Sequence, residues 1–480
     1  MSRLTYPDGS RRECIGGFEQ EYSAGIKVAP GVEEWYRQPL LSTVTKSGHF
    51  GFDDDGSRNY IDVGDHPERA NAEDTDFMRI AYRVIEGHIK TVAIYRSGKE
   101  GEATHNPAIS KIFLGTNTTD FGSDTWGYHL NTIALRTVPL INYAQGLIAH
   151  HASRIIWSAN GAPQLIPEDG EMKQVFCLSE RAEHIWETIS LDTTRSRPLM
   201  NTRDEPLAND GLYRRIHDVS CEPVFSPYVN ALLVASESII SRATELGVDF
   251  GNLVPKNPIR AMRMVSHDPD MKTKIELVNG KKVTGPELQK LIAERAIKAT
   301  LGADYLTTQE KEWAGRWIEI IDAVNKDSND CIHQLDWVLK RHHLEREKPV
   351  AAMSEAEFKK AQVKGYGYHQ LLPSEGIGMR ALRKGFFELS PDMEQLEKGL
   401  PLPNTRAAVR GKFVKAAKAA GGCLLGTDWD RVRVRFENGE SGGWTGERTF
   451  LLNDPYKAQD DSVDAYVENV LAPIITARAA

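Results

Sequence analysis

The sequence predicts an α+β fold, because strand-like segments gather in the first third of the chain and helix-like segments follow. The chain has 480 residues, 40% of them hydrophobic and 26% charged, which is typical of a globular protein. It shows no internal repeat of the length found in solenoids and propellers, so those architectures are excluded. This order of elements fits helices packed on one face of a mostly antiparallel sheet.

The early strands are short, and apolar and polar residues alternate along them. We expect strands at 16–23, 60–63, 111–114 and 129–138. Between the second and third of these, apolar residues at helical spacing predict a helix over 76–94. Asp74 is its expected N-cap, since its side chain can accept a hydrogen bond from the first helical turn.

The rest of the chain is mainly helical and ends in a separate small unit. Helices are expected at 140–156, 226–246, 285–299, 308–325, 329–346 and 354–363. The proline-rich stretch LEKGLPLPNT predicts a domain boundary, with a large domain over 1–403 and a small C-terminal domain over 404–480. The small domain should contain a basic helix at 406–420, strands near 429–436 and 449–452, and a terminal helix.

Composition excludes several classes of protein. The net charge of −8 argues against a protein that binds nucleic acid through bulk positive charge. No apolar run approaches the ~18 residues of a membrane helix, and the N-terminus lacks a signal-peptide pattern. Five scattered cysteines without a CxxC pair suggest neither a zinc cluster nor a disulfide framework. We therefore expect a cytoplasmic protein without nucleic-acid or membrane partners.

Two acidic patterns are candidates for a metal site. Glu19 and Glu21 stand two apart in a strand, so their carboxylates share a face roughly 6–7 Å apart. Tyr60 and Asp62 share a strand face in the same way, and Glu68 follows after a turn. Mg²⁺ prefers such oxygen ligands. From these residues alone, a solvated strand face and a solvated turn are the more common interpretations, and a metal site is the alternative.

A group of arginines is the other polar concentration. They occur within 178–206 and 213–217, and comprise Arg195, Arg197, Arg203, Arg214 and Arg215. Guanidinium groups bind phosphate and carboxylate oxygens in pairs, so the group forms either a buried salt-bridge network or a wall around a transferring phosphoryl group. Because GxxxxGK[ST] is absent, a P-loop is excluded.

Longer motifs carry a family resemblance. GGFEQEY, NYIDVGDHPERANAE, TNTTDFGSDTWGYHLN, CLSERAEHIWE, TTRSRP, NTRDEP, YRRIH, NPIRAMRMVSHD and LDWVLKR follow one another along the chain. In order and spacing they resemble the Pup ligases, which with the related depupylase/deamidase descend from glutamine-synthetase-like carboxylate–amine ligases. The similarity extends from about Gly16 to about Val470.

The resemblance implies a glutamine-synthetase-like fold and site. A curved antiparallel sheet would form a cradle for ATP and Mg²⁺ in a catalytic domain over 1–403, and the small C-terminal domain would complete the nucleotide site. The implied metal ligands or neighbours are Glu19, Glu21, Tyr60, Glu68, His129 and His217. The implied nucleotide contacts are Arg58, Asn71, Arg203 and Trp429. Asp62 matches the catalytic aspartate.

The implied reaction is ligation. ATP would convert the γ-carboxylate of the C-terminal Glu of a Pup-like modifier to a γ-glutamyl phosphate, and Asp62 would deprotonate a substrate lysine that forms the isopeptide bond. A depupylase/deamidase with Asp62 as nucleophile, a ligase of small molecules and an inactive scaffold are the alternatives. The short segment between Glu21 and Tyr60 favours the ligase, since depupylases resemble one another in a long insertion there.

Four departures from the family pattern are expected to bear on substrate choice. Leu130 and Leu207 replace a usual Glu and His, and Asn71 replaces a Thr. The segment SCEPVFSP at 220–227 stands where the family has a Gly-Asp-Ser/Ala-Asn sequence.

Overall fold

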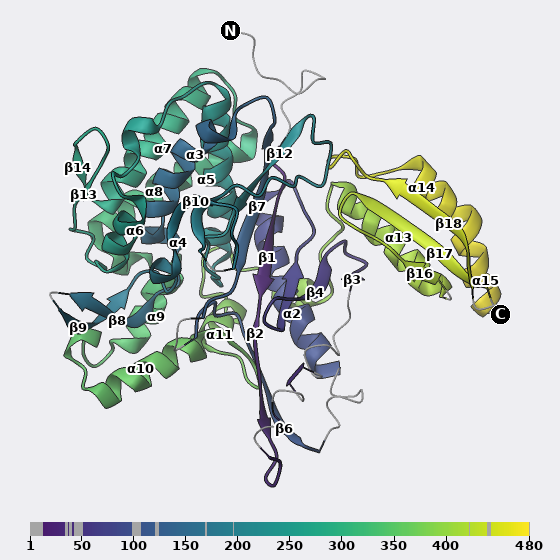
Figure 1. The fold of residues 1–480 in the computed structure, drawn as a ribbon, viewed down its shortest axis with the longest axis horizontal. Coiled ribbons are helices and arrows are strands. Elements are labelled where there is room, and N and C mark those ends of the chain that lie inside the picture. The colour runs from purple at the N-terminus through teal and green to yellow at the C-terminus, as the bar shows by residue number, and fades with distance from the viewer. Residues whose placement is uncertain are drawn as a thin grey trace.

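A computed structural model describes residues 13–33, 37, 41–42, 51–97, 107–120, 124–168, 170–194, 196–421, 423–438 and 443–479. A large sheet lies at the centre, a bundle of helices covers one side of it, and the C-terminal elements project on the other side (Figure 1). This is the predicted α+β architecture.

The central sheet has eight strands in the order β10-β11-β12-β7-β1-β5-β4-β3. Their bounds are β1 Gly16–Glu21, β3 Gly51–Phe52, β4 Arg58–Asp62, β5 His66–Ala70, β7 Tyr128–Leu135, β10 Glu187–Ser190, β11 Pro198–Asn201 and β12 Tyr213–Asp218. Its pairs are antiparallel except for β10 with β11, which run parallel. Strands from both early and later parts of the chain therefore meet in one surface.

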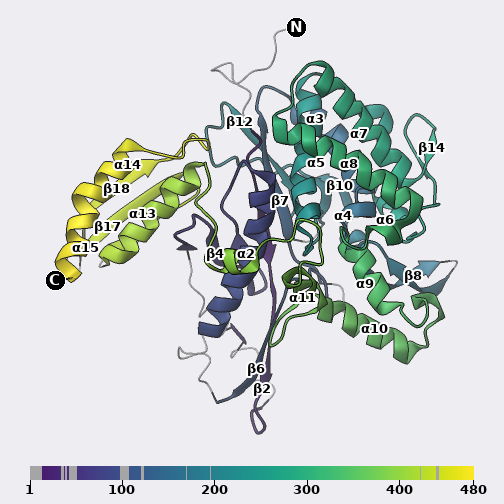
Figure 2. The same cartoon turned by 180° about the vertical axis from the view of Figure 1, so that it is seen from behind.

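Helices cover the back of this sheet, as Figure 2 shows from behind. They are α2 Phe77–Ser97, α3 Leu140–Ser153, α4 Ile155–Ser158, α5 Pro227–Glu245, α6 Pro258–Ser266, α7 Gly285–Gly302 and α8 Thr308–Asp327. Every residue of α5 is buried, and α5 packs on α2, α7, α8 and β7. Apolar residues of the sheet such as Phe18, Tyr128 and Leu130 join this core.

Smaller elements surround the main layers. A second sheet has the order β15-β6-β2, with β2 Ser23–Val28, β6 Ile109–Gly115 and β15 Gln370–Leu372. Two hairpins are formed by β8 Ala162–Glu168 with β9 Glu171–Cys177, and by β13 Ile275–Glu276 with β14 Lys282–Val283. The remaining helices before the C-terminal unit are α9 Asp336–Leu344, α10 Glu355–Tyr368, α11 Ile377–Arg383 and α12 Met393–Glu397, with single turns η2 Ala182–His184, η3 Gly251–Leu253, η4 Ser328–Cys331 and η5 Val350–Ala352.

The C-terminal unit has a small sheet and helices of its own. Its elements are α13 Arg406–Ala420, β16 Cys423–Leu425, β17 Arg431–Asn438, β18 Gly443–Leu451, α14 Asp461–Tyr466, η6 Val467–Leu471 and α15 Ala472–Ala479. Its hydrophobic core includes Val409, Phe413, Val432 and Val434. Arg410 attaches α13 to the large sheet region, since its guanidinium pairs with Glu73 and donates to the Gly56 carbonyl oxygen at 2.9 Å. The boundary at 403/404 stays a prediction.

Most expected helices form, and their starts have a local cause. Capping boxes begin α7, α8 and α10, in which Thr or Ser accepts from the third residue of the helix and Glu at that position returns the hydrogen bond. The helix expected at 140–156 is divided into α3 and α4 at Arg154. The prediction of one helix over 329–346 was wrong in its first part, because η4 ends at Cys331 and α9 begins only at Asp336.

The prediction that Asp74 is the N-cap of α2 was wrong. Asp76 caps this helix, since its Oδ1 accepts from the backbone N–H of Arg79 at 2.8 Å. Asp74 is fully buried and instead accepts from the guanidinium groups of Arg79 and Arg83. Two arginines within reach hold this carboxylate away from the helix end. None of the helices in the described ranges combines the length and the apolar character that crossing a membrane requires.

Candidate active site

The acidic residues meet in one row across three strands. In the register of the sheet, Glu21 of β1 lies opposite Glu68 of β5, and Glu68 lies opposite Tyr60 of β4. Side chains of directly opposed residues project from the same face. The two acidic patterns of the sequence, far apart along the chain, therefore share one surface, which is the face turned away from Leu130 and the helices.

One cluster in this row consists of carboxylates alone. Oxygens of Glu21, Asp62 and Glu68 lie within 4.8 Å of one another. The backbone N–H of Gly127 donates to Glu21 Oε1 at 2.7 Å, and the Tyr60 hydroxyl donates to Glu68. Burial, reinforced by the neighbouring carboxylates, raises the pKa of Glu68 well above its usual value. An all-oxygen group with this mutual repulsion fits a hard divalent cation such as Mg²⁺.

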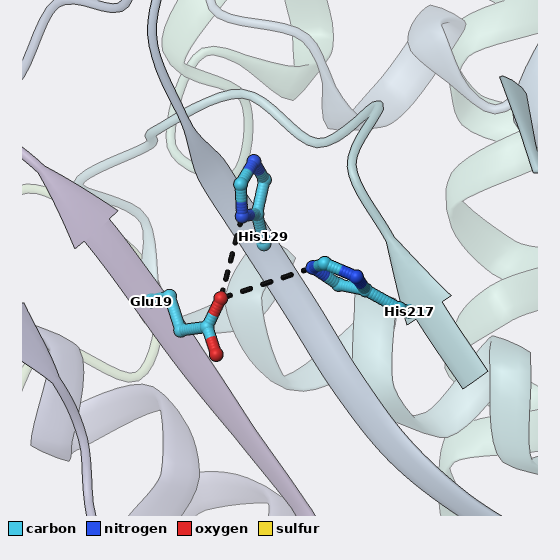
Figure 3. A group of neighbouring side chains, drawn as sticks. All are labelled: Glu19, His129 and His217. Carbon is cyan, nitrogen blue, oxygen red and sulfur yellow. Dashed lines mark hydrogen bonds and ion pairs between the residues drawn. The ribbon is translucent and has the colours of Figure 1, made fainter. Parts of the chain in front are cut away.

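A second cluster joins β1 to β7 and β12. Figure 3 shows the Glu19 carboxylate between two imidazoles, with His129 Nδ1 3.3 Å and His217 Nε2 3.8 Å from Oε2. Burial alone would raise the pKa of Glu19, but the hydrogen bond with His129 and the proximity of His217 lower it to about 2. Burial also lowers the pKa of His217 well below its usual value, which favours the neutral imidazole.

These histidines have nitrogens available for a ligand. Among the described residues, His129 Nε2 and both ring nitrogens of His217 are buried without a hydrogen-bond partner. Buried polar atoms are rarely left in this state, so their presence supports a bound metal ion or phosphate group next to Glu19. Imidazole is a softer ligand than carboxylate, so the cluster with Glu68 suits Mg²⁺ better than the one with the histidines does.

A cavity adjoins Glu19 where the C-terminal unit approaches the sheet. It is partly open to solvent. Residues of the large sheet region line it together with Arg406, Trp429 and Pro455 of the C-terminal unit. Asn71 is in the lining, and its side-chain oxygen is buried without a partner among the described residues. A space that a ligand can enter thus lies beside Glu19.

Trp429 is fixed at the wall of this cavity. The guanidinium of Arg410 lies over its indole at 4.8 Å from the ring centroid and donates to its carbonyl oxygen at 2.9 Å. The ring of Phe52 packs edge-on against it at 5.1 Å. A large, fixed aromatic side chain at a cavity wall is suited to stacking on a planar base.

Two expected nucleotide contacts lie outside the lining found for the described residues. The Arg58 guanidinium lies over the Tyr60 ring at 5.2 Å, with Asp428 at 3.9 Å. Arg203 pairs with Glu205 at 3.0 Å, and both side chains are half exposed. The lining contains Glu205 and Arg215 in that region instead. The nucleotide roles of Arg58 and Arg203 stay predictions.

Comparison with known proteins gives the family of this chain. A model of the family described as Pup-ligase protein matches residues 29–433. The chain belongs to this family.

Curated relatives agree with the family assignment. A Pup–protein ligase from Actinosynnema mirum is 32% identical over 425 residues, covering 86% of this chain and 89% of the relative. One from Acidimicrobium ferrooxidans is 30% identical over 433 residues, covering 87% and 89%. These relatives are similar along nearly their whole length, so the chain is an enzyme of the ligase type.

Solved structures agree with the fold. The Pup ligase PafA in complex with ADP superposes with a TM-score of 0.74 at 25% identity, covering 95% of this chain and 97% of that chain. A complex between Pup and its ligase PafA superposes with a TM-score of 0.79 at 23% identity, covering 98% and 93%. The likeness confirms the expected fold, including the presence of the C-terminal unit.

Two arginines near the acidic cluster were not assigned to the site from the sequence. Arg181 was missed, and Arg197 was named only as a member of the arginine group. Arg181 is fully buried, and its Nε and Nη2 are without partners among the described residues. Arg197 is also buried, and this burial, with the charge of Arg181 nearby, lowers its pKa to about 10 despite Glu21 and Asp62. The motif TTRSRP pointed to Arg197, whereas nothing in CLSERAEHIWE distinguishes Arg181 from a structural arginine.

The segment 220–227, with Val219 before it, binds the Arg181 guanidinium through backbone carbonyl oxygens. The Arg181 guanidinium donates to the carbonyl oxygens of Val219 and Cys221 at 3.0 and 2.7 Å. Glu222 accepts from the backbone N–H of Asn160 at 3.0 Å, and Ser226 caps α5. The segment is buried and contacts Arg181, and none of its residues belongs to the cluster of Glu21, Asp62 and Glu68.

Leu130 was misinterpreted as a departure that bears on substrate choice. It is fully buried in the core behind the sheet, because adjacent residues of a strand point to opposite faces and His129 occupies the site face. Leu207 and Asn71, in contrast, both line the cavity. Of the three single-residue departures, two therefore contact the space next to Glu19.

Proposed function

We propose that this member of the Pup-ligase family forms an isopeptide bond between the C-terminal glutamate of a Pup-like modifier and lysines of protein substrates, at the expense of ATP. The observation that carries the proposal is the cluster of Glu21, Asp62 and Glu68, which shares a sheet face with Glu19 at a cavity lined by Trp429. The reaction class is that of its relatives, which are Pup–protein ligases.

The reaction requires activation of a carboxylate. A γ-carboxylate oxygen attacks the γ-phosphorus of ATP, so that an acyl phosphate forms and ADP leaves. The lysine nitrogen then attacks the acyl carbon, the C–O bond to phosphate breaks, and phosphate is released. Bound Mg²⁺ would offset the charge of the phosphate oxygens.

Glu21 and Glu68 are the residues best suited to hold that metal ion, with Glu19 at the adjoining cluster. Tyr60 is a weaker candidate, since its hydroxyl donates to Glu68 and burial keeps its pKa well above its usual value. A neutral phenol in this position orients the Glu68 carboxylate. His129 and His217 are placed to contact either a second ion or a phosphate oxygen.

The buried arginines complement the anionic substrates. Arg181 and Arg197 lie within electrostatic range of Glu21, and Arg215 lines the cavity near Glu19. Guanidinium nitrogens without partners can donate to carboxylate or phosphoryl oxygens. They would stabilise the negative charge that develops while the phosphoryl group is transferred.

Asp62 is proposed as the base for the lysine. A lysine amine is protonated at neutral pH and must lose a proton before it attacks. Asp62 ends β4 and is partly exposed, so an incoming protein side chain can reach it. Its carboxylate is the member of the acidic cluster next to the open turn between β4 and β5.

The test uses purified protein with Pup ending in glutamate, ATP, Mg²⁺ and a lysine-bearing protein, read by intact mass. We expect conjugate and ADP from the unmodified protein. Asp62→Asn should lose at least 100-fold in conjugation while nucleotide binding stays within a few-fold. An unchanged conjugation rate in this variant would remove the base assignment. Cleavage of a preformed conjugate without ligation would favour the depupylase instead.

The cellular setting is part of the proposal. Cys14, Cys177, Cys221 and Cys331 are buried free thiols. Unpaired buried thiols fit a reducing cytoplasm. The placement of Trp429 and Arg406 at the cavity also supports a C-terminal domain that completes the nucleotide site.

A further inference from the structure

An aromatic pair stands at the open end of the acidic face. The ring of His66, the first residue of β5, stacks on the indole of Trp126 with centroids 4.6 Å apart and an angle of 24° between the planes. Trp126 is 7% exposed, whereas His66 is partly exposed. His66 therefore covers the indole and is itself in contact with solvent.

Hydrogen bonds fix both rings. His66 Nδ1 lies 3.1 Å from the carbonyl oxygen of Tyr22, and because a carbonyl accepts, this nitrogen carries the hydrogen. The indole Nε1–H of Trp126 donates to the carbonyl oxygen of Asn117 at 2.5 Å. The pair is a rigid surface held by the backbone of two other segments.

This surface is next to Asp62. In the register of β4 and β5, His66 lies directly opposite Asp62, which places the two side chains on the same face about 5 Å apart at Cβ. Gly64, at φ 88°, forms the turn between them, and a Cβ there would lie 3.1 Å from His66 Cδ2. Glycine thus leaves room for the imidazole to lean over the turn. Val63 in the same turn is 72% exposed, so this end of the sheet faces solvent.

We propose that His66, backed by Trp126, is the platform along which the acceptor lysine enters, with its methylene chain on the imidazole face and its amine at Asp62. The proposal rests on the proposed function and adds a specificity-determining residue to it. The lysine must reach an acyl carbon at the acidic cluster while its protein stays outside the sheet. A long, flexible side chain achieves this, and its methylenes and ammonium group both interact favourably with an aromatic face.

The chemistry of the step is unchanged by the platform. Asp62 takes one proton from the ammonium group, and the amine nitrogen forms the bond to the acyl carbon. Phosphate leaves with the electron pair of the broken C–O bond and takes up the second proton from the nitrogen. His66 contacts the alkyl chain and transfers no proton. It is a positioning residue, so its loss should affect long amines and spare small nucleophiles that need no guide.

Two substitutions distinguish the role of the His66 ring from the role of its hydrogen bond to Tyr22. His66→Asn retains a donor for the Tyr22 carbonyl oxygen and removes the aromatic face. His66→Phe retains the face and removes the donor. Each variant is supplied with Pup ending in glutamate, ATP and Mg²⁺, and either Nα-acetyl-lysine or hydroxylamine as nucleophile. Hydroxylamine nitrogen attacks the acyl phosphate, releases phosphate and gives a hydroxamate.

We expect kcat/KM for acetyl-lysine to fall five- to tenfold in His66→Asn, mainly through KM, while hydroxamate formation stays within twofold. His66→Phe should restore most of the transfer to lysine. The reverse pattern, with His66→Asn active and His66→Phe inactive, would overturn the proposal. The hydrogen bond to the Tyr22 carbonyl oxygen, and not the aromatic face, would then be the function of His66. Equal losses with both nucleophiles would also overturn it. If the unmodified protein makes no hydroxamate, the proposed function itself fails, and the platform fails with it.

Discussion

Glu73 connects the C-terminal unit to the sheet, and its replacement by glutamine is the most quantitative test of this junction. Its carboxylate accepts from Arg406 at 2.9 Å and from Arg410 at 2.5 Å. Both arginine side chains are nearly inaccessible, with exposed fractions of 6% and 0%. The Glu73→Gln variant would leave two buried guanidinium groups without their counter-charge.

The pKa of Glu73 gives the magnitude. Burial would raise it, but Arg410 and Arg406 lower it from 4.5 to about 2. Since a tenfold change in an ionisation constant is about 1.4 kcal/mol, the charged form is worth about 3 kcal/mol to the folded state. The range for removing one partner of a buried ion pair, about 3–5 kcal/mol, agrees with this value.

Urea denaturation at neutral pH measures the effect. The free energy of unfolding should fall by about 3 kcal/mol in Glu73→Gln. Asp322→Asn is the matched control, because it breaks the exposed pair of Asp322 with Lys290 and should cost under about 1 kcal/mol. Equal losses in the two variants, or a loss below about 0.5 kcal/mol in Glu73→Gln, would refute the reasoning.

The same ion pair makes an acid-sensitive contribution. Because the pKa is lower in the folded protein than the ordinary 4.5, the stabilisation is present above pH 4.5 and is lost as the pH falls towards 2. Stability measured between these pH values should decrease less in Glu73→Gln than in the unmodified protein. A decrease of the same size in both proteins would show that another group is responsible.

The remaining predictions concern the metal site and the core. Glu68→Gln removes one member of a repelling carboxylate cluster, so without metal the melting temperature of the variant should equal or exceed that of the unmodified protein. Its rate of ADP formation should fall at least 100-fold. A clear loss of stability would contradict the metal assignment. Addition of EDTA should abolish ADP release in the unmodified protein, and Mg²⁺ should restore it; full activity in EDTA would exclude the metal. Leu130→Ala should cost about 2–5 kcal/mol by leaving a cavity in the core, with the choice of acceptor unchanged; a change of acceptor at full stability would return Leu130 to the site.

The sequence predicts the composition of the acidic face better than its geometry. Glu19 and Glu21 share a face by strand alternation, and this is visible locally. That Glu21 lies opposite Glu68 depends on the pairing of β1 with β5, which is non-local and follows from no pattern in either segment. From the sequence, only the family resemblance placed Glu21 and Glu68 in one site.

Leu130 was misinterpreted and Arg181 was missed, for different reasons. The position of Leu130 in the core was predictable, because it follows His129 in a strand and alternation assigns the two to opposite faces. The environment of Arg181 was not predictable. Its guanidinium donates to carbonyl oxygens of a segment some forty residues away in sequence, and burial with unpartnered nitrogens is a property of the tertiary structure.

The acyl phosphate is the key intermediate of the proposed reaction, and the transfer of labelled oxygen to phosphate reports its formation. Pup carrying heavy oxygen in its terminal γ-carboxylate is incubated with the protein, ATP, Mg²⁺ and a lysine-bearing substrate, and the released phosphate is analysed by mass spectrometry. We expect one labelled oxygen in the phosphate for each isopeptide bond formed, because the bridging oxygen leaves with the phosphoryl group. Conjugate formed with unlabelled phosphate would contradict it.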